Sequence, residues 1–211
     1  MKIKTFLIVS ALALGFYTSS NAIENQTNET AKKSAKKSFI ASGNYSVDKS
    51  KSDIKWKGTM TGVFSHTGTL ALIEGSVKVK NGKITQGSFT VDMNSILTSD
   101  SDDNYKNAPR EDLVFHLKSD DFFAVEKYPT ASFKITKHSG NEISGDLTIR
   151  GITSKETMTN VKLTETDDSF SATGNLVFNR QKYEVSYKNR MGDMVISDDI
   201  ELTISISGVK E

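Results

Sequence analysis

The chain has 211 residues, of which 36% are hydrophobic, 27 are Lys or Arg and 26 are Asp or Glu, so its formal net charge is +1. This length suits one domain with or without a tail, and the near-neutral balance argues against nucleic acid as the main partner, which requires a basic face. Because there is no cysteine, disulfide bonds, a thiol nucleophile, cysteine-ligated zinc and a cysteine-linked lipid are excluded.

The first 22 residues have the pattern of a secretory signal peptide. Lys2 and Lys4 form a short basic start, and the mostly apolar residues 5–17 that follow are too few to span a bilayer. Ser20 and Ala22 place small residues at the −3 and −1 positions of a cleavage site. We therefore expect cleavage near Ala22 and a periplasmic or secreted protein.

Residues 23–42 are polar and contain two pairs of lysines, which predicts a flexible tail. A weak attraction of these lysines to anionic lipid heads stays open, so we expect membrane contact to be transient at most. The remaining residues 43–211 carry 21 basic and 24 acidic side chains. We expect them to form one mildly acidic folded domain.

From residue 45 onward, apolar residues recur at every second position, which is the period of a half-buried strand. Asn81-Gly82 lies between two such runs and predicts a hairpin, because both residues accept positive φ in a type I′ turn. Further turns are expected at residues 139–141, at Gly151 and at residues 167–169. The runs predict about eight antiparallel strands, near residues 54–64, 73–79, 84–93, 131–135, 143–149, 161–163, 170–178 and 200–206.

One stretch, residues 94–129, breaks this alternation. Pro109 followed by two acidic residues is typical of a helix start, so we expect one short helix that ends before Lys118 and covers a mouth of the fold. Closure of the strands into a barrel removes exposed sheet edges. We thus predict an all-β fold, an eight-stranded antiparallel barrel with one short helix inserted between strands; a solid sandwich is the alternative.

The sequence carries no motif that identifies an enzyme. Neither G-x-S-x-G nor GxxxxGK[ST] occurs, and the adjacent Asp120 and Asp121 would point to opposite faces of an extended chain rather than form a dyad. The three histidines are widely spaced and match no metal-binding motif. We expect no enzymatic activity and no metal site, although an Asp and a His brought together in a cleft by folding would favour an envelope enzyme.

An acidic loop leaves calcium binding as an open question. Asp100, Asp102, Asn104 and Glu111 have the spacing of positions 1, 3, 5 and 12 of a calcium-binding loop. Position 6 of such a loop is glycine because the chain turns sharply there, whereas this chain has Tyr105. A solvated polar loop is therefore the favoured interpretation.

Five segments of the chain have a distinctive sequence. The longest is HLKSDDFF-x-V-E-K-Y-P-T-A-x-F-K at residues 116–134, and the shorter ones are YSVD at 45–48, SDIKW at 52–56, GSFTVDM at 87–93 and GDLTIRGIT at 145–153. Taken in order, these segments resemble the YceI-like family of polyisoprenoid-binding proteins, and the resemblance covers residues 45–207. This resemblance implies a lipocalin-like barrel in the periplasm whose lumen holds one long isoprenoid chain, and it implies no catalytic activity.

The ligand expected from this resemblance is a polyisoprenoid or quinone-like lipid, bound for carriage or storage, with no other cofactor. The alternative is an envelope protein-interaction or stress-related module without a lipid, and homodimer formation stays open. The candidate lumen residues are Trp56, Met60, Phe64, Phe89, Phe115, Phe122, Phe133, Leu147, Phe170, Leu176 and Phe178. The candidates for contact with a polar lipid head are His66, His116, Arg150 and Arg180.

Overall fold

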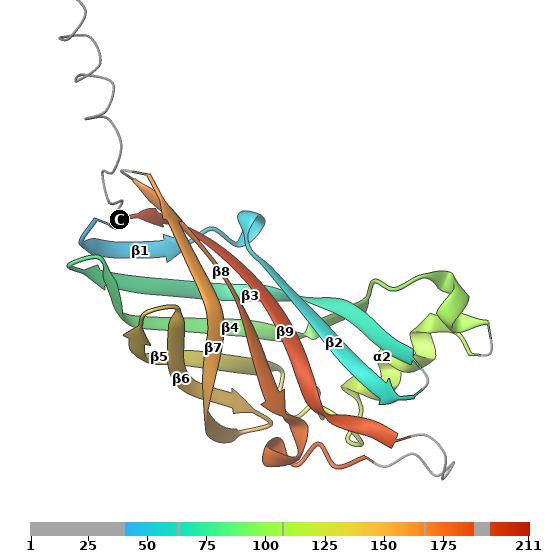
Figure 1. Cartoon of the computed structure of the whole chain (residues 1–211). Helices are drawn as coiled ribbons and strands as arrows, with labels where there is room; N and C mark the ends of the chain where they lie inside the picture. The colour runs from blue at the N-terminus through green and yellow to red at the C-terminus, as the bar shows by residue number, and fades with distance from the viewer. Residues whose placement is uncertain (1–40, 63, 107, 167, 188–194) are drawn as a thin grey trace, which may run out of the picture. The chain divides into compact units, whose positions relative to one another are not determined.

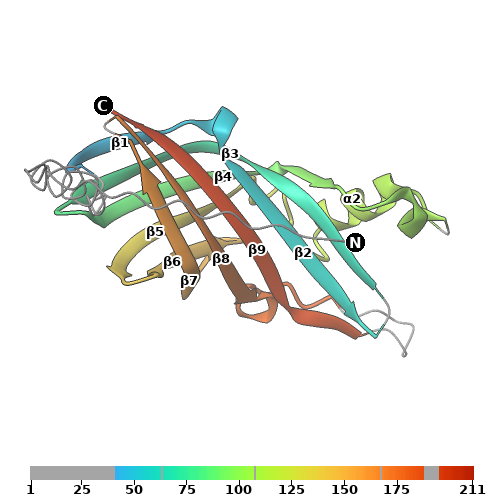
Figure 2. The same ribbon diagram turned by 45° about the horizontal axis from the view of Figure 1, so that its top comes forward.

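The computed structural model describes residues 41–62, 64–106, 108–166, 168–187 and 195–211 (Figures 1 and 2). The predicted signal peptide at residues 1–22 lies outside the described residues, as does the predicted tail at residues 23–42 except for its last two residues. In the part of the chain that the structure describes, no helix has the length and apolarity needed to cross a membrane.

The domain is a closed antiparallel barrel. Neighbouring strands follow the order β1-β3-β2-β9-β8-β7-β6-β5-β4, and an additional pairing of β3 with β4 closes the ring. The strands are β1 (Gly43–Val47), β2 (Asp53–Thr61), β3 (Phe64–Lys80), β4 (Lys83–Thr98), β5 (Thr130–Ser139), β6 (Glu142–Ile149), β7 (Ile152–Glu165), β8 (Ser169–Asn179) and β9 (Val195–Lys210). This confirms the predicted barrel, and the sandwich alternative is wrong.

Nine strands occupy eight positions around the barrel, because β1 and β2 share one. Both pair with β3 on one side and with β9 on the other. A short 3-10 helix, η2 (Lys49–Lys51), separates them. The predicted number of barrel positions is therefore right, while the first position is a strand interrupted by one helical turn.

The hairpin predicted at Asn81-Gly82 is present, with φ values of 54° and 71° at these two residues. A second turn with two positive φ values joins β6 to β7 at Arg150 and Gly151, which have φ values of 52° and 75°. Gly140, with φ of 61°, lies in the turn between β5 and β6. Residue 167, in the turn predicted at 167–169, lies outside the described residues.

Strand β3 begins at Phe64, earlier than the predicted residue 73. The alternation is hidden in its first half because His66 and Gly68 occupy positions where other strands have aliphatic residues. A Cβ on Gly68 would lie 1.8 Å from the Leu97 carbonyl oxygen, so only glycine permits this approach. The alternation predicts that Ile73 is buried. It is 41% exposed, because the register of β3 against β4 shifts between Leu72 and Glu74.

The predicted helix is α2 (Arg110–Lys118), which lies between β4 and β5 together with the 3-10 helix η3 (Asp102–Tyr105). It includes Lys118, one residue beyond the expected end. Figures 1 and 2 show α2 and β1 at opposite ends of the barrel. We call the end with α2, η3 and the 3-10 helix η4 (Arg180–Tyr183) the helix end, and the end with β1 and the turns at 81–82 and 140–141 the hairpin end.

Most of the buried apolar residues form two clusters, one toward each end. The helix-end cluster consists of Met93, Ile96, Phe122, Val125, Ala131, Leu147, Ile149, Leu176, Phe178, Tyr183 and Val185. The hairpin-end cluster consists of Tyr45, Val77, Val79, Ile84, Ile135, Ile143, Val161, Phe170 and Ile206. The strands therefore place apolar side chains inside the barrel along its whole length.

Candidate functional site

A cavity runs through the interior of the barrel and touches both core clusters. The space open to the centres of water-sized molecules is about 230 Å³, whereas roughly 10–15 Å³ in this measure is enough for one water. Strands β2 to β9 all contribute side chains to its wall, and Leu113 and Leu117 of α2 line it at the helix end. The barrel is therefore hollow and has a core that its own side chains do not fill.

The wall of this cavity is apolar except toward one end. Among its lining residues, four have polar side chains: Thr59, His66, Ser132 and Arg180. All four come from strand segments near the helix end or from η4. Toward the hairpin end the lining consists of residues such as Val77, Ile84 and Phe170, so the cavity is chemically polarised along its length.

Most of the residues predicted for the lumen lie on this wall. The lining includes Trp56, Met60, Phe89, Phe122, Phe133, Leu147, Phe170, Leu176 and Phe178. Phe64 and Phe115 are absent from it. The structure places these two residues elsewhere than predicted, since they are 38% and 78% exposed.

Phe115 lies on the outward face of α2, while Leu113 and Leu117 of the same helix line the cavity. Residues four apart share one face of a helix, and the residue midway between them does not. The i, i+4 spacing of the two leucines is visible in the sequence and indicates that they share one face of the helix. Neither leucine was among the predicted lumen residues. Phe64 is the first residue of β3, and its ring and the His66 ring pack nearly perpendicular to each other, with centroids 4.9 Å apart.

The four residues predicted for head-group contact fall into two pairs. His66 and Arg180 line the cavity, whereas His116 and Arg150 are not among its lining residues. His116 Nε2 lies 3.3 Å from a carboxylate oxygen of Asp121. Arg150 Nη1 donates to the backbone carbonyl groups of Phe122 and Glu184, at 2.6 and 2.8 Å. Arg150 therefore ties two helix-end segments together from outside the lumen.

Arg180 is buried, and the chain itself occupies its hydrogen-bonding groups. Its Nε donates to the Ser197 carbonyl group at 3.0 Å, and its Nη1 donates to the carbonyl groups of Val185 and Tyr187. Its Nη2 reaches the Ile196 carbonyl group at 3.4 Å and the Asp198 carboxylate at 3.0 Å. A guanidinium has five N–H donors, so these five contacts account for all of them, and burial lowers the pKa of Arg180.

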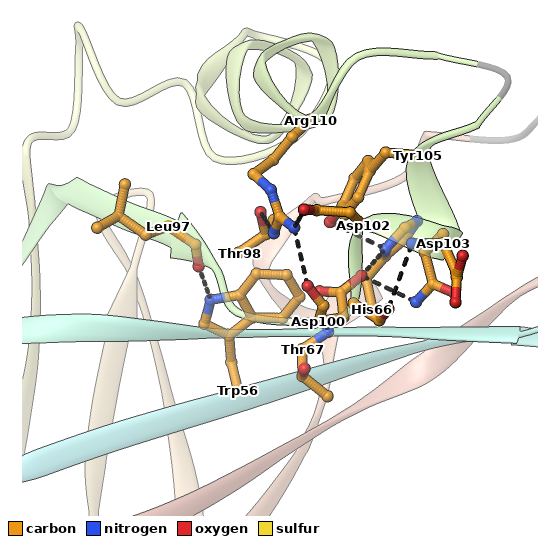
Figure 3. Close-up of polar contacts among 12 residues, drawn as sticks. Trp56, His66, Thr67, Leu97, Thr98, Asp100, Asp102, Asp103, Tyr105 and Arg110 are labelled. Atoms are coloured by element: carbon orange, nitrogen blue, oxygen red, sulfur yellow. Dashed lines mark hydrogen bonds and ion pairs between the residues drawn. The ribbon is translucent and has the colours of Figure 1, made fainter.

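His66 forms a close pair with Asp100 at the helix end of the cavity (Figure 3). Its Nδ1 lies 2.8 Å from Oδ2 of Asp100, whose side chain is only 8% exposed. The backbone N–H of Thr67 donates to Oδ1 of Asp100 at 3.1 Å, and Asn104 Nδ2 donates to Oδ2 at 3.1 Å. Burial opposes ionisation of Asp100, but the hydrogen bonds from His66, Asn104, Thr67 and Tyr105 outweigh it and hold its pKa well below the usual range.

Two further side chains stack outside this pair. The Tyr105 ring lies over the His66 ring with centroids 5.5 Å apart and planes 27° apart. The Arg110 guanidinium lies 4.2 Å from the centre of the Tyr105 ring and donates to Thr98 Oγ1 and to the Asp100 carbonyl group, each at 2.8 Å. The loop that follows β4 is thereby held against His66, as Figure 3 shows.

These contacts involve the acidic loop whose spacing resembles that of a calcium-binding loop. Asp100 faces His66, Asp102 pairs with Arg110, and Asn104 donates to Asp100. Within the described ranges, no three or more His, Cys, Asp or Glu side chains form a group that could hold a metal ion. Three of the four side chains with this spacing are thus engaged by His66, by Arg110 or by each other.

Comparison with known proteins identifies the family of this barrel. Residues 45–208 match the family described as the YceI-like domain. The chain belongs to the YceI-like domain family. A UPF0312 protein of Staphylococcus aureus is 32% identical over 110 residues, which cover 48% of this chain and 63% of that protein. The matched segment thus spans less than two thirds of the length of this curated relative.

Two solved structures share the fold of this YceI-like domain. Burkholderia cenocepacia BcnA superposes with a TM-score of 0.60 at 20% identity, covering 76% of this chain and 98% of that one. A polyisoprenoid-binding domain from Saccharophagus degradans, described as implicated in plant cell wall breakdown, superposes with a TM-score of 0.57 at 12% identity. It covers 79% of this chain and 98% of its own. At these identities the likeness establishes the fold alone.

Proposed function

We propose that this YceI-like domain binds one elongated apolar lipid, of the polyisoprenoid or quinone-like class, inside its barrel for carriage or storage. The observation that carries the proposal is the cavity that runs from Leu117 at the helix end to Ile84 and Phe170 at the hairpin end. Its wall offers van der Waals contact on all sides and few polar groups. A flexible hydrocarbon chain fits such a wall, while a polar solute would lose its hydration without compensation.

Burial of apolar surface supplies the binding free energy in this proposal. At about 25 cal/mol per Å², roughly 400 Å² of buried lipid surface gives about 10 kcal/mol before losses. Ordering of the chain and loss of its free motion offset part of this gain. The expected affinity therefore depends on how much of the lipid enters the cavity.

Two further observations support the proposal. The Saccharophagus degradans domain, which shares the fold, is described as polyisoprenoid-binding. The signal-peptide pattern over residues 1–22 would deliver the domain to the periplasm or outside the cell, where an insoluble lipid requires a carrier to leave a membrane. We propose that the mature protein starts after Ala22, which the intact mass of exported protein would test.

The His66–Asp100 pair, the His–Asp pair that lies at the cavity, is the feature that most favours an enzyme, since hydrolases use such a pair to activate a nucleophile. A nucleophile would have to face Nε2, the imidazole nitrogen that Asp100 does not engage. The hydroxyl group of Tyr105 lies 3.4 Å from Nδ1 instead, and no described hydroxyl group is hydrogen-bonded to Nε2. We therefore propose binding without catalysis, which predicts that a bound lipid is recovered chemically unchanged.

The proposal is tested by filling the cavity. Ala172 lines it, and the next residue on β8, Thr173, is exposed on the outer face of the barrel. We expect native mass spectrometry of the purified protein to show a bound lipid of isoprenoid mass. We expect Ala172→Phe to bind long-chain isoprenoids at least tenfold more weakly, about 1.4 kcal/mol, with Thr173→Phe as the matched control.

The far-UV circular dichroism and melting temperature of both variants establish that they are folded. Equal affinities of folded Ala172→Phe, folded Thr173→Phe and the unmodified protein would show that the lipid does not occupy the lumen. An unmodified protein that carries no lipid and binds no isoprenoid in titration would refute lipid binding altogether and would favour a protein-interaction module.

A further inference from the structure

The chemical polarity of the cavity gives a bound lipid a preferred direction. His66 lines the cavity and has one ring nitrogen that no described residue engages: Nδ1 is bonded to Asp100, and no hydrogen bond joins Nε2 to another described residue. At the hairpin end the lining is formed by apolar side chains such as Val77, Ile84 and Ile143. A polar head is therefore best placed beside His66, with the apolar tail extending toward the hairpin end.

The partner of His66 determines which hydrogen bond Nε2 can make. An ionised carboxylate only accepts hydrogen bonds, so at 2.8 Å from Asp100 the Nδ1 atom must carry the proton. In a neutral imidazole the other nitrogen is then an acceptor. The low pKa of Asp100, which hydrogen bonds hold against the opposing effect of burial, keeps the carboxylate ionised and the tautomer fixed.

We propose that His66 Nε2 accepts a hydrogen bond from a hydroxyl group on the head of the bound lipid, and that Asp100 is the positioning residue that fixes this acceptor. The preferred ligand is then an uncharged isoprenoid with a free hydroxyl group, either an alcohol or a hydroquinone, oriented with its head at the helix end. This inference rests on the lipid-binding function proposed above and specifies the chemical class of its ligand.

An anionic head group fits this site poorly. Only His66 and Arg180 among the lining residues can carry a positive charge, and the five donors of Arg180 are engaged by carbonyl groups and Asp198. Asp100 adds a negative charge next to the proposed head position. A phosphate beside His66 would be repelled by the Asp100 carboxylate and would find no free N–H group on Arg180. Both effects raise the free-energy cost of burying it.

A carbonyl head group beside His66 also meets side-chain donors that are already engaged. The indole N–H of Trp56, which lines the cavity, donates to the Leu97 carbonyl group at 3.2 Å. The Thr59 hydroxyl group is paired with that of Ser65 at 3.0 Å. An oxidised quinone or an ether would therefore place an acceptor against the Nε2 lone pair, whereas a hydroxyl group would donate to it.

The test compares ligands that share one chain and differ only in the head: geranylgeraniol, its methyl ether and its monophosphate. Titrations are run at about pH 8, where histidine side chains are ordinarily neutral. We expect the alcohol to bind about fivefold to tenfold more tightly than the ether, the range of one net hydrogen bond. We expect the monophosphate to bind more weakly than either.

Asp100→Asn is designed to reverse this preference. Because the Thr67 N–H donates to Oδ1, the carbonyl oxygen of the new amide should stay at that position, which places the amide nitrogen opposite His66 Nδ1. The Asn104 amide, whose nitrogen donates to Oδ2 in the unmodified protein, would then turn over and accept from the new amide nitrogen. The amide would donate to Nδ1 and move the imidazole proton to Nε2, the same tautomer exchange that an Asp-to-Asn change produces in a catalytic triad. We expect the ether to bind this variant as tightly as the alcohol or more tightly.

His66→Phe removes the acceptor and keeps an aromatic ring, and we expect it to abolish the difference between alcohol and ether. The readout in each case is a ratio of affinities on one protein, which a general loss of stability does not change. Nitrogen NMR of the imidazole checks the mechanism directly, with the proton expected on Nδ1 in the unmodified protein and on Nε2 in Asp100→Asn.

Several outcomes would overturn the inference while leaving lipid binding intact. These are equal affinities for alcohol and ether, tighter binding of the monophosphate, a proton on Nε2 in the unmodified protein, or an unchanged ratio in both variants. Failure of all three ligands to bind would instead refute the lipid-binding function on which the inference rests.

Discussion

The two ends of the barrel are closed in different ways. At the hairpin end, Tyr45 is fully buried and packs edge to face on Phe170, with ring centroids 5.4 Å apart, within the strands of the sheet itself. At the helix end, the covering segments α2, η3 and η4 lie between strands and are attached by hydrogen bonds from Arg110, Arg150 and Arg180. One end is thus part of the sheet, and the other is a separate cover.

This difference bears on how a lipid enters. Opening the hairpin end requires breaking strand pairs and exposing a buried aromatic cluster. The free-energy cost of this opening is therefore close to that of unfolding the domain. Opening the helix end requires only local separation of segments outside the sheet, and such local openings cost less than global unfolding. The helix end, which also carries His66, is therefore the end at which we expect exchange of the ligand.

The largest effect is expected at the hairpin end, from Tyr45→Ala. The substitution removes a fully buried ring and the hydrogen bond from its hydroxyl group to the Ala41 carbonyl group, at 2.8 Å. Truncation of a buried aromatic residue to alanine costs about 3–5 kcal/mol. Urea unfolding followed by tryptophan fluorescence measures this loss.

Tyr45→Phe is the matched control, since it keeps the ring and removes only the hydroxyl group. We expect a loss of about 1 kcal/mol, the typical net contribution of one hydrogen bond. A loss for Tyr45→Ala no larger than that of the control would show that the hairpin end is not closed by aromatic packing, and the contrast between the ends would fail.

Much of the fold was predictable because strand alternation is a local property of the sequence. The period of two in β8, where Phe170, Leu176 and Phe178 are buried, required no knowledge of other strands. The turn at Asn81-Gly82 was equally local. The bulge that turns Ile73 outward was not predictable, because it depends on the register of β3 against β4.

The site was less predictable than the fold. The apolar wall follows from the alternation, and most predicted lumen residues lie on it. The His66–Asp100 pair joins the start of β3 to the loop after β4, and no spacing rule connects residues brought together by barrel closure. The predicted contact of Arg180 with a lipid head requires a free N–H group. Carbonyl groups of the chain that follows η4 accept from Arg180 instead, and the sequence does not reveal the path of that chain.

A smaller effect is expected at the helix end from titration of Tyr183. Its ring is fully buried, and its hydroxyl group donates to Glu156 at 3.2 Å. Burial, and next the charge of Glu156, raise the pKa of Tyr183 well above its usual value. The stability it contributes is therefore complete below the unfolded-state pKa of about 10 and is lost as the pH rises above that value.

Tyr183→Phe tests this linkage. We expect it to cost about 1 kcal/mol near neutral pH and to make the fall of unfolding free energy above about pH 10 shallower than in the unmodified protein. Glu156→Gln should retain most of the steep fall, because burial is the larger cause of the shift. Parallel curves for Tyr183→Phe and the unmodified protein would contradict the prediction.

The smallest effect is expected on the outer face of the cover, from Phe115→Ala. This side chain is 78% exposed, and surface substitutions usually change stability by less than about 0.5 kcal/mol. Leu117→Ala, two residues further along α2, removes a side chain that lines the cavity and should weaken isoprenoid binding measurably. If Phe115→Ala weakened binding as much as Leu117→Ala, the lipid would contact the outer face of α2, and the cover would be a docking surface instead of a lid over the lumen.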